Sequence, residues 1–437
     1  MTKFFLRKSL RVPCMALALF VSASGLLAQD SRATGANLPM VVNSNSQFAI
    51  DLYRQINADT GTENIFVSPF SISTALAMTY AGSRGNTRKQ MADLSHFNLS
   101  DENLQEEFSA LQAEIKTAAS DKFRLDVANA LWGEKDYHFD PAFASVINRY
   151  YGGGFHSVDF IGDAEGSRKK INQSVADSTE GNIQQLVSVG DINKFTRMVL
   201  TNAIYFKGNW ATKFNAQQTK NAPFTLSNAK IVNTPMMEQT GYFPFVREPG
   251  MIAVELPYAS YVLSMIVVLP DGDINKLGDS LSAETIQRIR KKMQAQIVGK
   301  VNVFLPRFTF ESRYYLEQTL ARMGMPDAFD KNNADFSGID GGRDLYLAHV
   351  IHQARIEVNE EGSEAAAATA VTTFVATAAR EVSPEQTFRA DRPFLFVIVH
   401  NATGSILFMG RMSNPAGAAA DMRKYNDGSD GAHEVRK

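Results

Sequence analysis

The chain has 437 residues, of which 44% are hydrophobic and 21% are charged, and its formal net charge at pH 7 is −2. This is the composition of a soluble globular protein, and the length suits one large domain or two of ordinary size. The slightly acidic balance disfavours a nucleic-acid partner.

The first 28 residues have the pattern of a signal peptide. A basic head is followed by an apolar run from Met15 to Val21 and then by small residues. The run is too short to span a bilayer comfortably, which favours a cleaved leader over a retained anchor. We expect cleavage after Ala28 or, as a second choice, after Ala23. The mature protein is then expected to be secreted or extracytoplasmic, either extracellular or periplasmic, without membrane association.

Cysteine usage excludes several kinds of chemistry. The only cysteine, Cys14, lies inside the leader. The mature chain is therefore expected to have no disulfide, no thiol nucleophile and no thiolate metal site, so its stability must come from packing and hydrogen bonds. Neither a metal nor a cofactor is expected.

After the leader, residues 29–45 are polar and rich in Ser, Asn and Gly, which predicts a flexible lead-in. Folded sequence is expected from residue 46. Apolar residues recur at helical spacing from Phe48 to Ile56, and a second apolar run, Ile72 to Tyr80, ends at the helix stop signal Ala81-Gly82. Two helices are therefore predicted early in the chain.

Further along, β-rich runs and helical patterns come in mixed order. The expected strands are 124–132, 198–206, 251–257, 261–269, 301–310 and 394–400, and the expected helices are 104–117, 164–178 and 283–293. The absence of regular βαβ alternation predicts an α+β fold with mostly antiparallel sheets. Residues 416–437 are rich in Ala, Gly, Asp and Lys, and we expect a disordered tail there.

Common catalytic motifs are absent. The sequence contains no Gly-x-Ser-x-Gly motif and no phosphate-binding loop ending in Gly-Lys-Ser or Gly-Lys-Thr. Gly152-Gly153-Gly154 lacks the third glycine of a dinucleotide fingerprint, and His433-Glu434 lacks a second histidine. We therefore do not expect an enzyme.

The segment from Ser363 to Ala379 is unusual for a surface loop, because it carries one charge and neither glycine nor proline. One set of alternate positions is small or β-branched throughout: Ser363, Ala365, Ala367, Thr369, Val371, Thr373 and Val375. A strand formed from this segment would bury that uncharged face and leave Glu364 in solvent. Taken alone, the segment is equally compatible with an Ala-Thr linker or a nascent helix, because alanine favours helix whereas threonine and valine disfavour it.

Two motifs that flank this segment resemble those of the serpin family. Residues 357–370, Glu-Val-Asn-Glu-Glu-Gly-Ser-Glu-Ala-Ala-Ala-Ala-Thr-Ala, resemble the proximal hinge of inhibitory serpins, and residues 388–398 resemble the serpin signature that follows the loop. Shorter matches occur at 64–72, 129–132, 201–210, 255–258, 305–308, 334–339 and 407–411. The resemblance covers about residues 48 to 415.

The resemblance implies a serpin domain over residues 46–415, with three mostly antiparallel sheets, eight or nine helices and an exposed reactive centre loop at about 360–388. It also implies a suicide-substrate mechanism, in which a serine protease attacks the loop, forms an acyl-enzyme and is trapped when the loop inserts as a new strand in the main sheet. The implied hinge consists of Glu360, Glu361, Gly362, Ser363, Glu364, Ala365, Ala366, Ala367, Ala368, Thr369 and Ala370.

By family spacing, the attacked bond lies sixteen residues beyond Glu360, between Ala376 and Thr377, where small side chains suit elastase-like proteases. The return to Pro393 is longer than in many family members, so other bonds stay open. Two alternatives are Arg380-Glu381 for trypsin-like proteases and Phe374-Val375 for chymotrypsin-like ones. Serine proteases are the expected partners, with cysteine proteases as a second class, and the inhibitor is expected to be a monomer.

A non-inhibitory serpin that acts as a carrier, chaperone or storage protein is the alternative function. Proline or bulky residues in the hinge would favour it, and this hinge contains neither.

Two supporting sites follow from the same resemblance. Ser68, Ser71, Asn202 and His352 match the shutter, a polar cluster beneath the main sheet that controls its opening, and Trp210 matches the breach, where insertion starts. A departure occurs at His349, where serine is common, and we expect this titratable group to lie near the shutter. The helix expected over 101–116 is rich in Asp and Glu, which disfavours a heparin-binding role for it.

Overall fold

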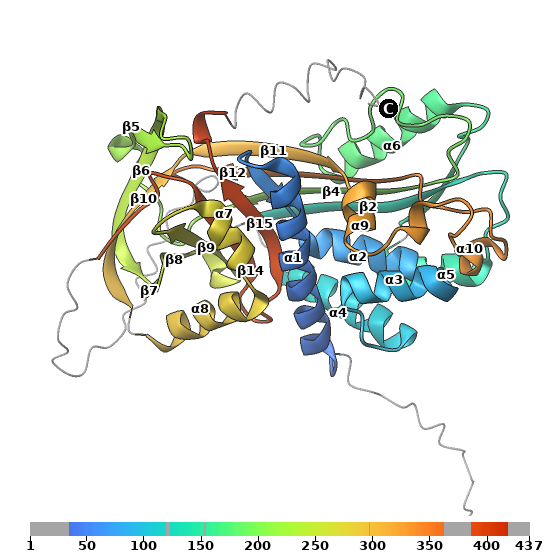
Figure 1. The fold of residues 1–437 in the computed structure, drawn as a ribbon, viewed down its shortest axis with the longest axis horizontal. Coiled ribbons are helices and arrows are strands. Elements are labelled where there is room, and N and C mark those ends of the chain that lie inside the picture. Colours follow the sequence, from blue (N-terminus) through green and yellow to red (C-terminus); the bar gives the residue numbers. More distant parts are fainter. Residues whose placement is uncertain (1–34, 119–122, 153, 297, 362–385, 418–437) are drawn as a thin grey trace, which may run out of the picture.

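The computed structural model describes residues 35–118, 123–152, 154–296, 298–361 and 386–417 (Figure 1). The α-helices in these residues are α1 (Leu38–Thr60), α2 (Pro69–Tyr80), α3 (Gly85–Ser95), α4 (Asp101–Ala118), α5 (Pro141–Tyr151), α6 (Ala164–Ser178), α7 (Ile274–Ser280), α8 (Ala283–Ala295), α9 (Glu317–Arg322) and α10 (Ser337–Asp340). They outnumber the eight or nine expected, because segments as short as α10 leave no periodic pattern in the sequence.

The strands form three sheets, as expected. The main sheet has the order β11-β12-β4-β2-β3 and comprises β2 (Phe123–Glu134), β3 (Phe155–Val158), β4 (Met198–Gly208), β11 (Phe308–Tyr315) and β12 (His349–Val358). A six-stranded sheet has the order β1-β15-β14-β9-β8-β7, with β1 (Ile65–Val67), β7 (Phe245–Glu248), β8 (Met251–Pro257), β9 (Leu263–Pro270), β14 (Phe394–His400) and β15 (Ile406–Met412). The third sheet has the order β13-β10-β6-β5, with β5 (Lys220–Thr225), β6 (Ile231–Phe243), β10 (Gly299–Pro306) and β13 (Gln386–Arg389).

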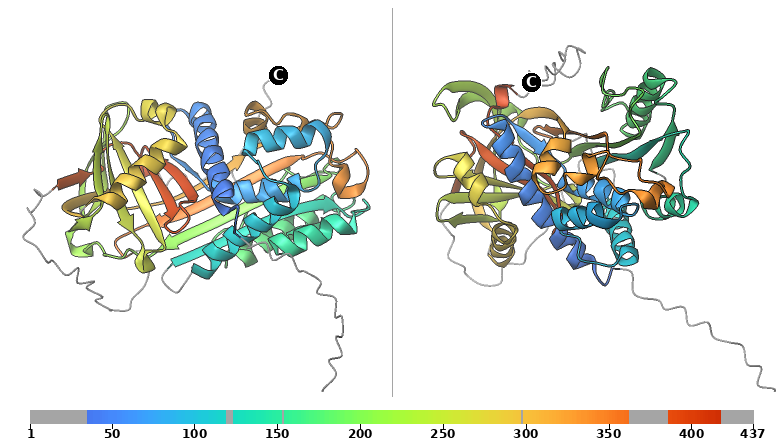
Figure 2. Two further views of the ribbon diagram at one scale, coloured as in Figure 1. Left: turned by 90° about the horizontal axis from the view of Figure 1, so that it is seen from below. Right: turned by 45° about the vertical axis from the view of Figure 1, so that its right-hand side comes forward.

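The long strands of the main sheet run between an end built mainly of the other two sheets and an end built mainly of helices (Figures 1 and 2). Helix α2 packs on one face of the main sheet against β2 and β4, and α6 packs on the opposite face against β2. Side chains alternate between the two faces, so Leu131 belongs to the larger core and its neighbour Trp132 to a smaller core beneath α6.

The run expected as a single strand over 301–310 is two strands in different sheets. β10 ends at Pro306 and β11 begins at Phe308. Proline has no amide hydrogen to donate to a ladder, so it suits a position where the chain leaves one sheet for another.

The expected lead-in over residues 29–45 is wrong for its last eight residues, because α1 begins at Leu38. Val41 is buried, and the Asn45 side chain is also buried, where its Nδ2 donates to the Ile406 carbonyl over 2.9 Å. The polar residues that suggested a loop are thus partly buried and hydrogen-bonded, which composition alone does not reveal.

We predict that Val41→Ala lowers the free energy of unfolding by about 1–2 kcal/mol, because it leaves a small cavity against the core. Met40→Ala is the matched control, since Met40 is exposed on the same helix, and it should change stability by less than about 0.5 kcal/mol. Urea unfolding followed by circular dichroism measures both. Equal effects of the two substitutions would contradict the placement of α1.

Candidate functional site: the parallel seam of the main sheet

Two central strands of the main sheet, β4 and β12, are parallel neighbours (Figure 1). They pair directly from His349 opposite Val199 to Ile356 opposite Phe206. β12 continues into Asn359–Glu361, where the described residues stop before 386. A chain that turned back at that point would run antiparallel to both strands and could hydrogen-bond to each of them. We call the β4/β12 junction the seam, and its end near Asn359 the hinge end.

At the hinge end of the seam, the backbone at Asn359 and Glu360 is hydrogen-bonded to the rest of the domain. Trp210 Nε1 donates to the Asn359 carbonyl over 2.8 Å, and the Trp210 ring stacks on Tyr258 with centroids 4.6 Å apart. The Phe214 amide donates to the Glu360 carbonyl over 3.0 Å. These contacts put Trp210 beside the start of the predicted hinge, and its role as the breach stays a prediction.

The Glu360 side chain is only 8% exposed, and its Oε1 lies 3.5 Å from Arg307 Nη1. A cavity beside this pair is lined by residues that include Lys207, Pro235 and Phe308. Glu360 and Glu361 are the predicted hinge residues that the structure describes. The hinge from Gly362 to Ala370 and the three candidate bonds, Ala376-Thr377, Arg380-Glu381 and Phe374-Val375, lie outside the described residues.

A polar row crosses the main sheet on the face that α2 covers. It is formed by residues that lie opposite one another on four strands: Asn129 of β2, Asn202 of β4, His352 of β12 and Tyr314 of β11. The Asn202–His352 pair lies directly on the seam. A strand entering the seam must therefore separate these two side chains.

The predicted shutter residues meet in this row. Asn202 Nδ2 donates to Ser71 Oγ over 2.7 Å, and His352 Nε2 accepts the Ser68 amide hydrogen over 3.2 Å. Because Nε2 is an acceptor, the proton of His352 resides on Nδ1, which donates to Asn202 Oδ1. Each of these buried polar groups has a hydrogen-bond partner. The closed row therefore holds the two strands together without leaving a buried donor or acceptor unsatisfied.

Asn129 is a member of the cluster that sequence reasoning missed. Its Oδ1 accepts from Ser71 Oγ over 2.9 Å and from Asn202 Nδ2. It lies in the quoted motif at 129–132, but its role depends on the register of β2 against β4, for which one sequence carries no signal.

The sequence predicted that His349 lies near the shutter, and this prediction is wrong. It is three residues from His352 on β12, so its side chain is on the opposite face, which α6 covers. Its Nδ1 lies 3.1 Å from Glu317 Oε1.

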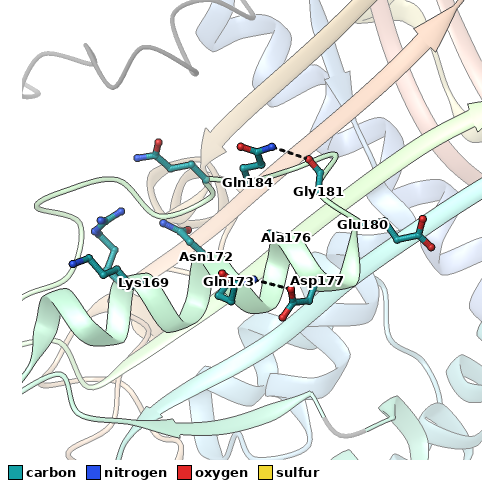
Figure 3. Close-up of a pocket in the computed structure, with 10 residues that line it drawn as sticks. Lys169, Asn172, Gln173, Ala176, Asp177, Glu180, Gly181 and Gln184 are labelled. Carbon is teal, nitrogen blue, oxygen red and sulfur yellow. Dashed lines mark hydrogen bonds between the residues drawn. The ribbon is translucent and has the colours of Figure 1, made fainter.

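A second cavity lies between α6 and the chain that follows it (Figure 3). Its polar groups are bonded to one another: Gln173 Nε2 donates to Asp177 Oδ1 over 2.7 Å, and Gln184 Nε2 donates to the Gly181 carbonyl over 3.3 Å. We assign no function to this cavity. Among the described residues there is also no cluster of potential metal ligands and no helix long and apolar enough to cross a membrane.

Comparison with known proteins agrees with this arrangement. The family model described as "Serpin (serine protease inhibitor)" matches residues 43–415. The chain belongs to the serpin family. Leukocyte elastase inhibitor of Xenopus tropicalis is 44% identical over 85% of this chain and 98% of its own length, and the Homo sapiens protein of the same name is 42% identical over 85% and 99%.

Solved structures show the same fold. Uncleaved ovalbumin has a TM-score of 0.75 with 30% identity over 86% of this serpin and 100% of the ovalbumin chain. Maspin has a TM-score of 0.79 with 26% identity over 87% of this serpin and 100% of the maspin chain. The expected α+β serpin fold is thus confirmed, and so is the expectation of a protease inhibitor family rather than an enzyme.

We predict that this serpin loses stability as the pH falls below about 6.5, the ordinary pKa of histidine. Burial lowers the pKa of His352 to about 3, so the fold keeps the ring neutral while the unfolded chain takes up a proton. This group alone removes up to about 1.4 kcal/mol per pH unit between those two values. Urea unfolding at pH 7, 6 and 5 measures the slope. It should be shallower in His352→Gln, and an unchanged slope would contradict a buried neutral His352.

Proposed function

We propose that this serpin traps serine proteases as covalent acyl-enzymes by inserting its cleaved reactive loop into the seam. The observation that carries the proposal is the direct parallel pairing of β4 with β12, together with the continuation of β12 into the hinge. A loop strand that followed β12 would complete an antiparallel pair on each side. The uncharged face from Ser363 to Val375 could enter without burying a charge, which would be costly.

The chemistry of the trap is an interrupted acyl transfer. The protease serine Oγ attacks the carbonyl carbon of Ala376, the peptide bond breaks, and the amine of Thr377 leaves with a proton. The ester then joins the protease to Ala376. Hydrolysis of this ester by water would free both proteins, so inhibition requires that loop insertion be faster than hydrolysis.

The inserted loop segment would be longer than the seam that receives it. β12 has 10 residues, whereas Ser363 to Ala376 would extend over about 46 Å at about 3.3 Å per residue. The inserted segment is therefore longer than the strand beside it. Full insertion would carry a protease attached at Ala376 from the hinge end of the seam to a point beyond the opposite end.

Elastase-like proteases are the first proposed targets, because Val375-Ala376 offers small side chains and the similar proteins named above are elastase inhibitors. Trypsin-like cleavage after Arg380 and chymotrypsin-like cleavage after Phe374 remain alternatives, and cysteine proteases are a second class of partner. We further propose that the leader directs this serpin, and with it this action, out of the cytoplasm.

The test is incubation of the serpin with pancreatic elastase and, separately, with trypsin, followed by denaturing electrophoresis. We expect an adduct that resists denaturant and a released C-terminal fragment whose mass identifies the cleaved bond. Cleavage without an adduct at every ratio would overturn the proposal and favour the carrier, chaperone or storage function instead.

A second prediction tests which face of the inserted loop becomes buried. Ala367→Arg should convert the inhibitor into a substrate and reduce the adduct at least about tenfold, because an unpaired guanidinium would have to be buried. Ala366→Arg is the matched control, since its side chain belongs to the opposite face and should leave most of the adduct. Densitometry of adduct against cleaved serpin gives the ratio. Equal losses in both variants would contradict the assigned faces.

A further inference from the structure

The described chain ends, after the last strand β15, in a capped helical turn. Asn64 holds the chain at this point: its Oδ1 accepts the Asn414 amide hydrogen over 2.9 Å, and its Nδ2 donates to the Asn414 carbonyl over 3.0 Å. Residues 415–417 are helical, and the Gly417 amide donates to Asn414 Oδ1 over 3.1 Å. Asn414 is therefore the N-cap of a helix that begins at Pro415, and proline suits that first position.

The sequence after this turn favours a longer helix. Residues 418–420 are alanines, which have the highest helix propensity, and the basic pair Arg423-Lys424 suits the last turn of a helix. Asn-Asp-Gly at 426–428 is a typical helix stop signal. The matched serpin model ends at residue 415, so this segment lies beyond the part of the chain that the family shares. A helix of about eleven residues is marginal in water by itself, and it needs a surface to pack against.

The burial of the first helical residues fixes which face of such a helix meets the domain. Pro415 is buried, whereas Ala416 is exposed. At 3.6 residues per turn, the side chains of Met422 and Tyr425 lie within about 80° of the Pro415 direction. The Arg423 side chain lies within about 20° of the Ala416 direction. A continued helix would therefore turn its methionine and tyrosine toward the domain and this arginine toward solvent.

A cavity of about 490 Å³ lies beside the end of the turn. It is lined by Gly417, by residues 310–314 of β11 and by residues 62–64 after α1. Consecutive strand residues point to opposite faces, so a cavity that touches all of 310–314 lies at the edge of β11. β11 is the outermost strand of the main sheet, and within the described residues no strand pairs with its outer edge. Natural proteins commonly cover such an edge with a helix or a loop.

The chain approaches this cavity from the hinge end of β11. Pro415 lines the cavity at the hinge end together with Phe308, whereas Gly417 lines the cavity beside residues 310–314. A continued helix would thus run along β11, away from the hinge. From Gly417 to Tyr425 it would rise about 12 Å at about 1.5 Å per residue. Residues 310–314 span about 13 Å at about 3.3 Å per residue, so the lengths match.

We propose that residues 415–425 form a helix that docks in this cavity, with Met422 and Tyr425 against β11, and covers the outer edge of the main sheet. The occupant is the chain's own C-terminal segment, because the capped turn delivers it to the mouth of the cavity. The docked helix joins β11 to the end of α1. Composition predicted a disordered tail over 416–437, and the proposal replaces that expectation for residues 416–425.

Crosslinking tests where the segment docks. The only native cysteine is removed by Cys14→Ser, and Met422→Cys is combined with Thr62→Cys on the wall of the proposed cavity. The matched control combines Met422→Cys with Asn233→Cys in the cavity at the hinge end, because Thr62 and Asn233 are both exposed. With a short thiol crosslinker, we expect a crosslinked monomer from the Thr62 pair. The Asn233 pair should give at least about tenfold less, since crosslinking follows the effective concentration of the two thiols.

Hydrogen exchange tests which face of the segment is buried. The amides of residues 419–425 should exchange slowly in the wild type. Met422→Ala should raise their exchange rate at least about fivefold, because it removes apolar contacts in the cavity. Arg423→Ala is the matched control, since its side chain points to solvent, and it should change the rate by less than about twofold. Mass spectrometry of peptic fragments measures both.

Absence of a crosslink with Thr62→Cys, or preferential crosslinking to Asn233→Cys, would overturn the docking site. A crosslinked dimer would show that a second copy supplies the segment and would overturn the intramolecular occupant. Fast exchange over 419–425 in the wild type, or equal effects of the two alanine substitutions, would overturn the docked helix. Neither measurement involves a protease, so failure of this proposal and failure of the proposed inhibition are distinguishable.

Discussion

The hydrogen-bonded ladder between β4 and β12 is the contact on which the rest of the structure depends. It joins two halves of the main sheet, each of which has its own antiparallel partner: β2 beside β4 and β11 beside β12. A parallel pair needs a long connection, and here much of the chain runs between the two strands. No tight turn therefore holds β4 against β12. Closure of the seam depends instead on the contacts on the two faces of the sheet and at the ends of the two strands.

The contacts that cross the seam on its two faces include discrete hydrogen bonds, and this suits a junction that must hold and then part. The Asn202–His352 pair on one face and the Arg313–Ser188 bond on the other are discrete hydrogen bonds, whereas the strands themselves are anchored by apolar side chains such as Ile204 and Ile356. Hydrogen bonds contribute about 1 kcal/mol each in net terms and can re-form with an incoming strand. Apolar burial holds each half of the sheet together while the seam between them opens.

Much of the fold could be predicted from local patterns. The apolar runs at 124–132 and 198–206 correspond to β2 and β4, and the helical spacing at 164–178 corresponds to α6. Where burial depended on distant partners, local patterns failed: Asn45 is polar yet buried in α1, and the 301–310 run divides at Pro306 between two sheets.

The site was predictable only in part, for a similar reason. The four residues predicted for the shutter from the family resemblance do lie in contact, and their role stays a prediction. Asn129 joins them through the register of β2 against β4, and His349 lies on the other face because strand residues three apart point in opposite directions. Parallel pairing of β4 with β12 is a long-range contact that the pattern of neither strand encodes. The alternation of small residues from Ser363 to Val375 was readable from sequence, whereas the seam that would receive it was not.

The most direct test of the account is a crystal structure of the serpin after cleavage of its loop. The account predicts that the chain from Ser363 onward forms a strand between β4 and β12, so that Asn202 and His352 are no longer on adjacent strands and their strands lie about 9.6 Å apart. A cleaved protein in which β4 and β12 still pair directly would contradict it.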